Sequence, residues 1–145
     1  MRKRRVITVA IIMLLMGIGY YFYNQMQFKT YEEVMSNMLS DEESIIRISI
    51  IDYETDSYFS TNNSELVEKL TFEPLNMEMK KNNKTPLNLN YVVFLHTNKE
   101  GKYDISLGET SLEFGYDGRY EIINENILYQ VIQNADIEWE PARSK

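Results

Sequence analysis

The feature that most constrains this chain is an apolar run near its N-terminus. Val6 to Tyr23 are 18 residues in which Thr8 is the only clearly polar member. As an α-helix rising about 1.5 Å per residue, the run would span about 27 Å, close to the ~30 Å thickness of a bilayer's hydrocarbon core. The sequence therefore predicts one membrane-spanning helix.

The residues on either side of this run predict its orientation. Arg2–Arg5 is a cluster of four basic residues directly before it, and Tyr20–Tyr23 closes it with four aromatic residues. Basic flanks stay in the cytoplasm, and ring-plus-hydroxyl side chains suit the membrane interface. We expect residues 1–23 to form a cytoplasmic N-terminus and a transmembrane signal anchor in the cell membrane, with the remainder extracytoplasmic.

A cleavable signal peptide is the alternative interpretation of the same segment. Gly17 and Gly19 have the small-residue spacing that a signal peptidase requires, so cleavage would leave Tyr20 as the mature N-terminus. No polar region separates the apolar run from this point, and the run continues into the aromatic residues. Both interpretations export the rest of the chain.

Charge is distributed unevenly between the two parts of the chain. Residues 1–23 contain no acidic residue, so residues 24–145 hold 11 basic and 22 acidic residues, a net charge of −11. Such a domain should repel nucleic acid and anionic membrane surfaces. The chain has no cysteine, which excludes disulfides, thiolate metal sites, a cysteine nucleophile and a lipid-modified cysteine anchor.

Residues 24–43 are expected to form a juxtamembrane helix and linker. From Tyr31 the apolar residues recur at helical spacing through Met35 and Met38, and Thr30 is the expected N-cap. The resulting stripe either packs on the domain or binds a partner. We therefore take Tyr31, Met35 and Met38 as candidate partner-binding residues.

Residues 44–145 show the pattern of a small antiparallel sheet. Apolar and polar residues alternate in Ser44–Asp52 and in Leu87–Leu95, and turns at Asn98–Gly101 and Tyr116–Gly118 join further short strands. Amphipathic stretches at Asn62–Leu70 and Ile127–Gln133 predict short helices. The predicted fold class is α+β: a transmembrane helix followed by an antiparallel sheet with one or two short helices on one face.

From Ser44 onward the order of elements resembles a known group. A strand (Ile45–Asp52), a capped short helix (Asn63–Leu70), a meander with the turn Asp117–Tyr120 and a closing helix (Ile127–Gln133) are similar to small extracytoplasmic domains of low-GC Gram-positive bacteria, the YhfM-like group. The chain lacks the lipobox cysteine of the lipoproteins in that group. The resemblance implies a cell-envelope location and no particular reaction.

No catalytic, cofactor or metal site is expected. His96 is the single histidine, and the sequence places no partner carboxylate and nucleophile beside it. Asp52, Glu54 and Asp56 have the spacing of half a calcium loop, but Ser57 and Asn63 stand where glycine and a bidentate glutamate are needed. A weak Ca²⁺ site at these three acids stays open.

The expected function is a non-enzymatic interaction or accessory module of the cell envelope. Further candidate partner-binding residues are Lys81 and Lys84, in the polar loop Lys80–Pro86, and Trp139 near the C-terminus. The partners would be the membrane and an envelope component or membrane protein, without nucleic acid. The alternatives are a small-ligand binder or hydrolase that uses a carboxylate cleft, and a cleaved secreted factor. Oligomeric state is left open.

Overall fold

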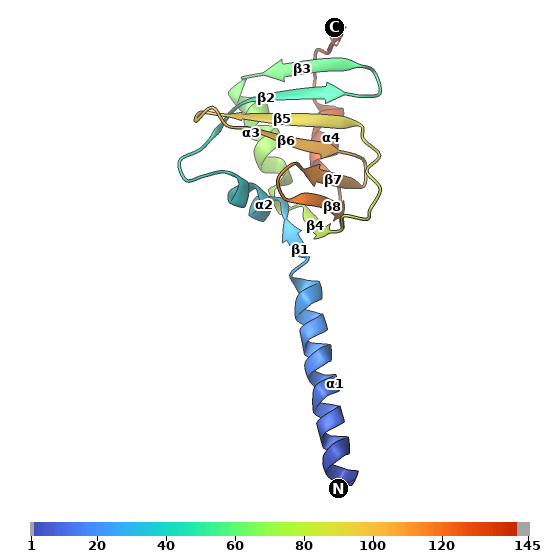
Figure 1. Cartoon of the computed structure of the whole chain (residues 1–145). Helices are drawn as coiled ribbons and strands as arrows, with labels where there is room; N and C mark the ends of the chain where they lie inside the picture. Colours follow the sequence, from blue (N-terminus) through green and yellow to red (C-terminus); the bar gives the residue numbers. More distant parts are fainter. Residues whose placement is uncertain (1, 142–145) are drawn as a thin grey trace.

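The apolar run forms the predicted helix. In the computed structural model, which describes residues 2–141, helix α1 spans Arg2–Gln25 and projects away from the rest of the chain (Figure 1). Its segment Ile7–Gln25 is long and apolar enough to cross a membrane, and none of its apolar window is buried. A signal sequence near an N-terminus has the same length and composition. The side chains of the predicted basic cluster lie outside the described part.

The strands form one antiparallel sheet, and the predicted α+β class is confirmed. In spatial order it runs β1-β4-β8-β7-β6-β5-β2-β3-β9, with β1 nearest to α1 and β3 farthest from it among the labelled strands (Figure 1). The strands are β1 (Phe28–Thr30), β2 (Ile45–Asp52), β3 (Ser57–Thr61), β4 (Glu78–Lys81), β5 (Tyr91–Thr97), β6 (Lys102–Leu107), β7 (Ser111–Phe114), β8 (Gly118–Ile122) and β9 (Glu140–Pro141).

Short helices cover one face of this sheet. The three short α-helices each begin at a polar N-cap: Thr30 and Glu33 form a complete capping box, and Asn63 and Asn126 each accept a hydrogen bond from a backbone N–H of the first turn. The apolar faces of these helices are buried, as their predicted amphipathic spacing requires. The helices are α2 (Tyr31–Met38), α3 (Ser64–Phe72), the 3-10 helix η1 (Glu73–Asn76) and α4 (Ile127–Asn134).

One hydrophobic core lies between the helices and the sheet. Tyr31 of α2, Phe114 of β7 and Tyr120 of β8 are at most 1% exposed, and their rings contact one another with Phe114 in the middle, at centroid distances of 5.8 and 5.9 Å. Alternate residues of the central strands, such as Ile48 and Val93, complete the core. The intervening residues of those strands therefore point to the opposite, open face.

Most of the predicted linker, residues 28–43, is part of the sheet domain, so the domain begins at Phe28 and not at the predicted residue 44. Strand β1 pairs with β4, and the backbone O of Gln27 accepts a hydrogen bond from Lys81 N at 2.8 Å. Tyr31, Met35 and Met38 are only 1, 4 and 8% exposed. They pack in the core and offer no partner-binding surface, because their stripe faces the sheet. Residues 142–145 of the predicted domain lie outside the described residues.

One predicted strand boundary differs in the structure, and the predicted turn at Asn98–Gly101 has a specific geometry. The strand predicted from Leu87 begins at Tyr91, because both neighbours, β2 and β6, end opposite that residue. In the β5–β6 turn the positive φ, 62°, belongs to Glu100. Gly101 is needed for space instead, since a Cβ there would lie 2.4 Å from the Glu43 carboxylate.

Candidate functional site

A polar cluster lies on the open face of the sheet. Arg47 and Ser49 of β2, Tyr58 and Ser60 of β3 and His96 of β5 form it, and we call these five residues the outer polar cluster. Ser49 Oγ lies 3.0 Å from Ser60 Oγ, 3.2 Å from His96 Nε2 and 3.3 Å from the Tyr58 hydroxyl, and Arg47 Nη2 lies 3.3 Å from His96 Nδ1. The register that opposes Arg47 and His96 brings these side chains together.

The hydrogen bonds of His96 determine what this cluster can do chemically. A guanidinium only donates, so Nδ1 accepts from Arg47 and Nε2 carries the ring proton, which it donates to Ser49 Oγ. Burial, followed by the charges of Arg47 and Lys102, lowers the pKa of His96. A general base would instead present a lone pair to the serine and hold a carboxylate on its other nitrogen. The arrangement suits recognition better than nucleophilic catalysis.

We expect Arg47→Gln to raise the pKa of His96 toward the ordinary histidine value, because it removes the cation 3.3 Å from Nδ1. The single histidine makes a proton NMR titration of the full chain unambiguous. Lys69→Gln, which removes a charge from the exposed face of α3, is the matched control. An unchanged His96 pKa in the Arg47 variant would contradict this assignment of the hydrogen bonds.

A hollow beside the outer polar cluster carries positive charge. Arg47, His96 and Lys102 line it together with the start of β2 and the β5–β6 hairpin, in which Glu100 adds one carboxylate to the two cations. Lys102 Nζ also lies 4.2 Å from the centroid of the Phe94 ring on the same face. The hollow and the neighbouring Phe94 ring therefore offer cations and an aromatic surface to a group that approaches the open face, although the domain as a whole is acidic.

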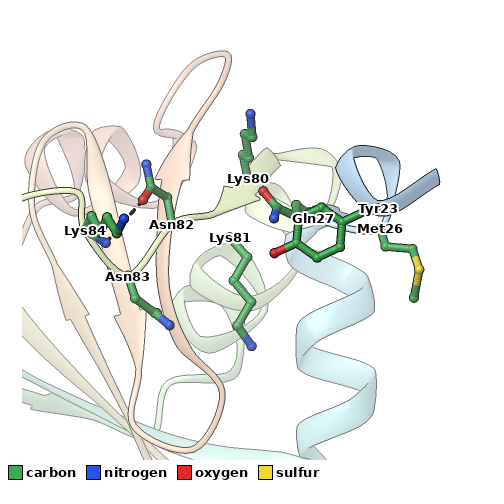
Figure 2. A pocket seen from close by; sticks show the side chains of 8 residues that line it. All are labelled: Tyr23, Met26, Gln27, Lys80, Lys81, Asn82, Asn83 and Lys84. Carbon is green, nitrogen blue, oxygen red and sulfur yellow. Dashed lines mark hydrogen bonds between the residues drawn. The ribbon is translucent and has the colours of Figure 1, made fainter. Parts of the chain in front are cut away.

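A second hollow lies where α1 meets the sheet, and Lys80, Lys81 and Lys84 line it (Figure 2). We call these three residues the lysine rim. The end of α1 contributes Tyr23, and Met26 follows it on the same side. Lys84 is exposed, whereas Lys80 and Lys81 are half-buried. The loop predicted as an exposed partner-binding segment thus faces the end of the apolar helix.

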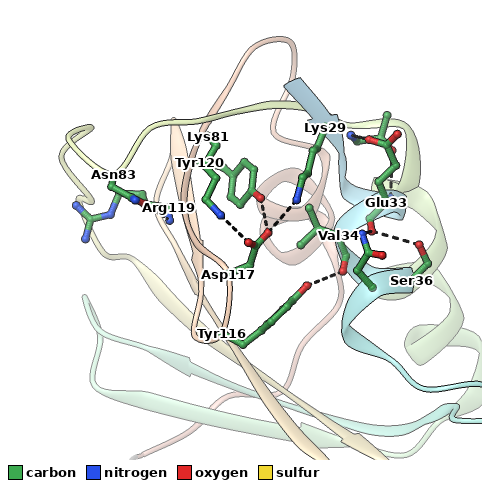
Figure 3. Close-up of polar contacts among 12 residues, drawn as sticks. Lys29, Glu33, Val34, Ser36, Lys81, Asn83, Tyr116, Asp117, Arg119 and Tyr120 are labelled. Carbon is green, nitrogen blue, oxygen red and sulfur yellow. Dashed lines mark hydrogen bonds and ion pairs between the residues drawn. The ribbon is translucent and has the colours of Figure 1, made fainter. Parts of the chain in front are cut away.

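Asp117 holds β1 and β4 to the turn between β7 and β8 (Figure 3). Its carboxylate contacts Lys81 Nζ at 2.5 Å and Lys29 Nζ at 3.3 Å, and it accepts a hydrogen bond from the Tyr120 hydroxyl. Burial would raise the pKa of Asp117, but the hydrogen bonds from Lys81, Tyr120 and Lys29 outweigh it and lower the pKa to about 2. Lys81 therefore stabilises the fold through its ion pair with Asp117. Of the two lysines predicted to bind a partner, Lys84 is the one whose side chain is exposed.

Trp139 packs on the sheet near its far edge. Its ring stacks on Tyr91 at 6.3 Å with an interplanar angle of 16°, and meets Phe59 at 6.1 Å. The residues that follow form β9, which pairs with β3. Trp139 is half-buried, so much of the aromatic surface that made it a candidate partner-binding residue packs within the domain.

Asp52 is used in a local turn. Its Oδ1 accepts from the backbone N of Glu54 at 2.8 Å and of Thr55 at 3.2 Å, which engages one of the two carboxylate oxygens. Within residues 2–141, no group of three or more His, Cys, Asp or Glu side chains could hold a metal ion. The Ca²⁺ interpretation of Asp52, Glu54 and Asp56 therefore gains no geometric support.

A carboxylate cleft for acid catalysis needs a carboxyl group with a raised pKa. Glu43 and Asp117 instead have pKa values lowered to about 2. For Glu43 the causes are hydrogen bonds, first from Thr97, at 2.5 Å, and then from Ser40 and Tyr103. Both groups are held as anions that join segments of the fold.

Comparisons with protein-family models, curated proteins and solved structures find no match to this chain. The candidate sites therefore rest on geometry. Sequence reasoning singled out His96 as the single histidine but missed Arg47, Ser49 and Tyr58 beside it. The alternation of apolar and polar residues in β2 was the available signal that Arg47 and Ser49 lie on the open face. The contact between Arg47 and His96, which are 49 residues apart, depends on the register between β2 and β5.

Proposed function

We propose that this chain is a single-pass membrane protein whose extracytoplasmic domain is a non-enzymatic interaction module of the cell envelope. The observation that carries the proposal is an exposed apolar helix of spanning length, joined almost directly to a folded domain. The positive-inside rule supports a cytoplasmic N-terminus. The resemblance to YhfM-like domains, which rests on the order of elements, supports an envelope location and remains part of the proposal.

The short connection supports a domain held at a defined height. Only Met26 and Gln27 separate α1 from β1, and two residues extend at most about 7 Å. Gln27 is itself hydrogen-bonded to β4. A domain attached in this way stays beside the membrane surface and presents the same surfaces to its surroundings.

The open face of the sheet is the surface that we assign to the partner. The two edge strands are poor templates for strand addition, because β1 has three residues and β9 has two, one of them Pro141. The open face carries the outer polar cluster and the positive hollow lined by Arg47 and Lys102. We propose a protein or envelope component that brings an anionic group to this hollow.

A photo-crosslinking side chain at Asp104, an exposed position of β6 on the open face, is expected to capture a reproducible partner in intact cells. The same side chain at Glu68, exposed on α3, is the matched control. Arg47→Gln with Lys102→Gln should abolish capture, whereas Lys69→Gln with Lys99→Gln should preserve it. Captured material should carry residues 1–19 and resist alkaline extraction from membranes.

Two results would count against parts of this proposal. Equal capture from Asp104 and Glu68, in repeats with a working bait, would contradict the open face as the binding surface. A mature N-terminus at Tyr20 would replace the tethered module with a secreted factor, because cleavage there removes most of the apolar run.

A further inference from the structure

We infer that the lysine rim binds the phosphate groups of anionic lipids in the outer leaflet and holds the base of the domain against the membrane. The inference rests on the proposed membrane anchor and adds a lipid-binding surface to it. The inference is argued from the positive charge of the lysines and from their position beside the end of α1. It assigns to Lys80 and Lys84 a partner different from the one proposed for the open face.

The position of the rim follows from the end of α1. Tyr20–Tyr23 is the aromatic segment suited to the membrane interface, and Tyr23 lines the same hollow as the lysines (Figure 2). The polar headgroup layer is about 5–7 Å thick on each side of the hydrocarbon core. Since Met26 and Gln27 alone lead from α1 to the sheet, the rim must lie at or close to this layer.

The chemistry of the rim suits that depth. Lys80 is half-buried and Lys84 is exposed. Among the described residues, no carboxylate lies within ion-pair distance of either lysine. Glu121 lies opposite Lys80 in the β4–β8 pair and is the nearest acidic position in the ladder. Asn82 and Asn83 add amide groups between the two lysines along the loop (Figure 2).

Apolar side chains accompany these cations, as expected at an interface. Met26 is 78% exposed, and Phe28, the first residue of β1, is 40% exposed. Lys80 Nζ lies 5.2 Å from the centroid of the Phe28 ring. Apolar groups directed to the acyl boundary with lysine heads among phosphates form an interfacial surface. The net charge of −11 on residues 24–145 opposes binding to anionic lipid. Acidic groups more than about 8 Å from the rim are screened at physiological ionic strength, so the local positive charge of the rim acts at the membrane surface.

The test is lysine footprinting of the full chain in vesicles. The chain is reconstituted into phosphatidylcholine vesicles with or without phosphatidylglycerol, acetylated briefly and mapped by mass spectrometry. Acetylation of Lys80 and Lys84 should slow on the order of fivefold with the anionic lipid, since a lysine at a charged surface gains about 1 kcal/mol. Lys69 on α3 and Lys99 in the β5–β6 turn are internal controls and should be unaffected.

Further arms separate the possible sources of protection. Free inorganic phosphate with phosphatidylcholine vesicles should not protect the lysines, and 1 M salt should remove the protection because the Debye length falls to about 3 Å. Lys80→Gln with Lys84→Gln should also reduce the preference of the chain for spin-labelled phosphatidylglycerol. Lys69→Gln with Lys99→Gln should retain it. Lys81 is left unchanged because it pairs with Asp117.

Three outcomes would overturn the inference. Equal acetylation in both kinds of vesicle would show that the rim has no preference for the anionic lipid, because phosphatidylcholine also carries a phosphate group. Protection by free phosphate alone would assign the rim to a soluble anion. Protection that is absent in both kinds of vesicle but present when the same footprinting is done in native cell membranes would assign it to an acidic protein. A chain that fails to float with either vesicle contradicts the membrane anchor itself, so the two proposals fail in distinguishable ways.

Discussion

Tyr31→Ala is expected to lower the free energy of unfolding by about 3–5 kcal/mol, the usual cost of removing a buried aromatic ring. Tyr31 is 1% exposed and its ring contacts Phe114 at 5.8 Å. The loss is large against a typical total stability of about 5–15 kcal/mol. Urea unfolding of the full chain in mild detergent measures it, with Trp139 as the single tryptophan reporter.

Two variants make this result interpretable. Tyr31→Phe keeps the ring and should cost much less, which guards against a Tyr31→Ala chain that does not fold. Glu32→Ala, at an exposed position of the same helix, should change stability little. If Tyr31→Ala cost less than about 1 kcal/mol, then α2 would be an appendage, as the linker interpretation of residues 24–43 had it.

Asp117→Asn is expected to lower the free energy of unfolding by on the order of 2 kcal/mol near neutral pH. The carboxylate side chain is 19% exposed and faces Lys29 and Lys81, which the variant leaves without a counter-charge. The same unfolding measurement reports the loss. Asp136→Asn, at an exposed position after α4, is the matched control.

The pH dependence of this difference has a defined sign. The pKa of Asp117 is lowered to about 2 in the folded chain, below the ordinary value of about 3.9. Its contribution is therefore fully present above that ordinary value and is lost as the pH falls toward 2. The gap between wild type and Asp117→Asn should close over this range. A gap that stays constant from pH 6 to pH 2 would contradict the assignment. Glu43 titrates in the same window in both chains, so it cancels in the comparison.

Features that depend on neighbours in the sequence were predictable. The N-cap at Thr30 and the turn in which Gly118 adopts a φ of 103° each involve only a few consecutive residues. The apolar helix is of the same kind, because its length and composition are sufficient to identify it. The sequence left neighbouring polar residues open as the caps of the later helices, and the structure selects Asn63 and Asn126. The α+β class follows from these local patterns and from alternation in the strands.

The candidate sites were predictable only in part. Lys84 was singled out and is exposed, while Tyr31, Met35 and Met38 were singled out and are buried. A helical stripe has the same spacing whether it meets a partner or its own sheet, so periodicity cannot distinguish the two. Lys81 was chosen as an exposed loop residue, but a carboxylate 36 residues away engages it.

The sequence by itself determined an N-terminal helix of spanning length, the approximate positions of most strands and helices, and the absence of cysteine chemistry. These are properties of composition and of short-range periodicity. The tertiary structure decided that the domain begins at Phe28, that Arg47 meets His96, and that the lysine rim lies beside the end of α1. Each depends on the register between strands distant in the chain, which burial of the core selects and no local pattern encodes.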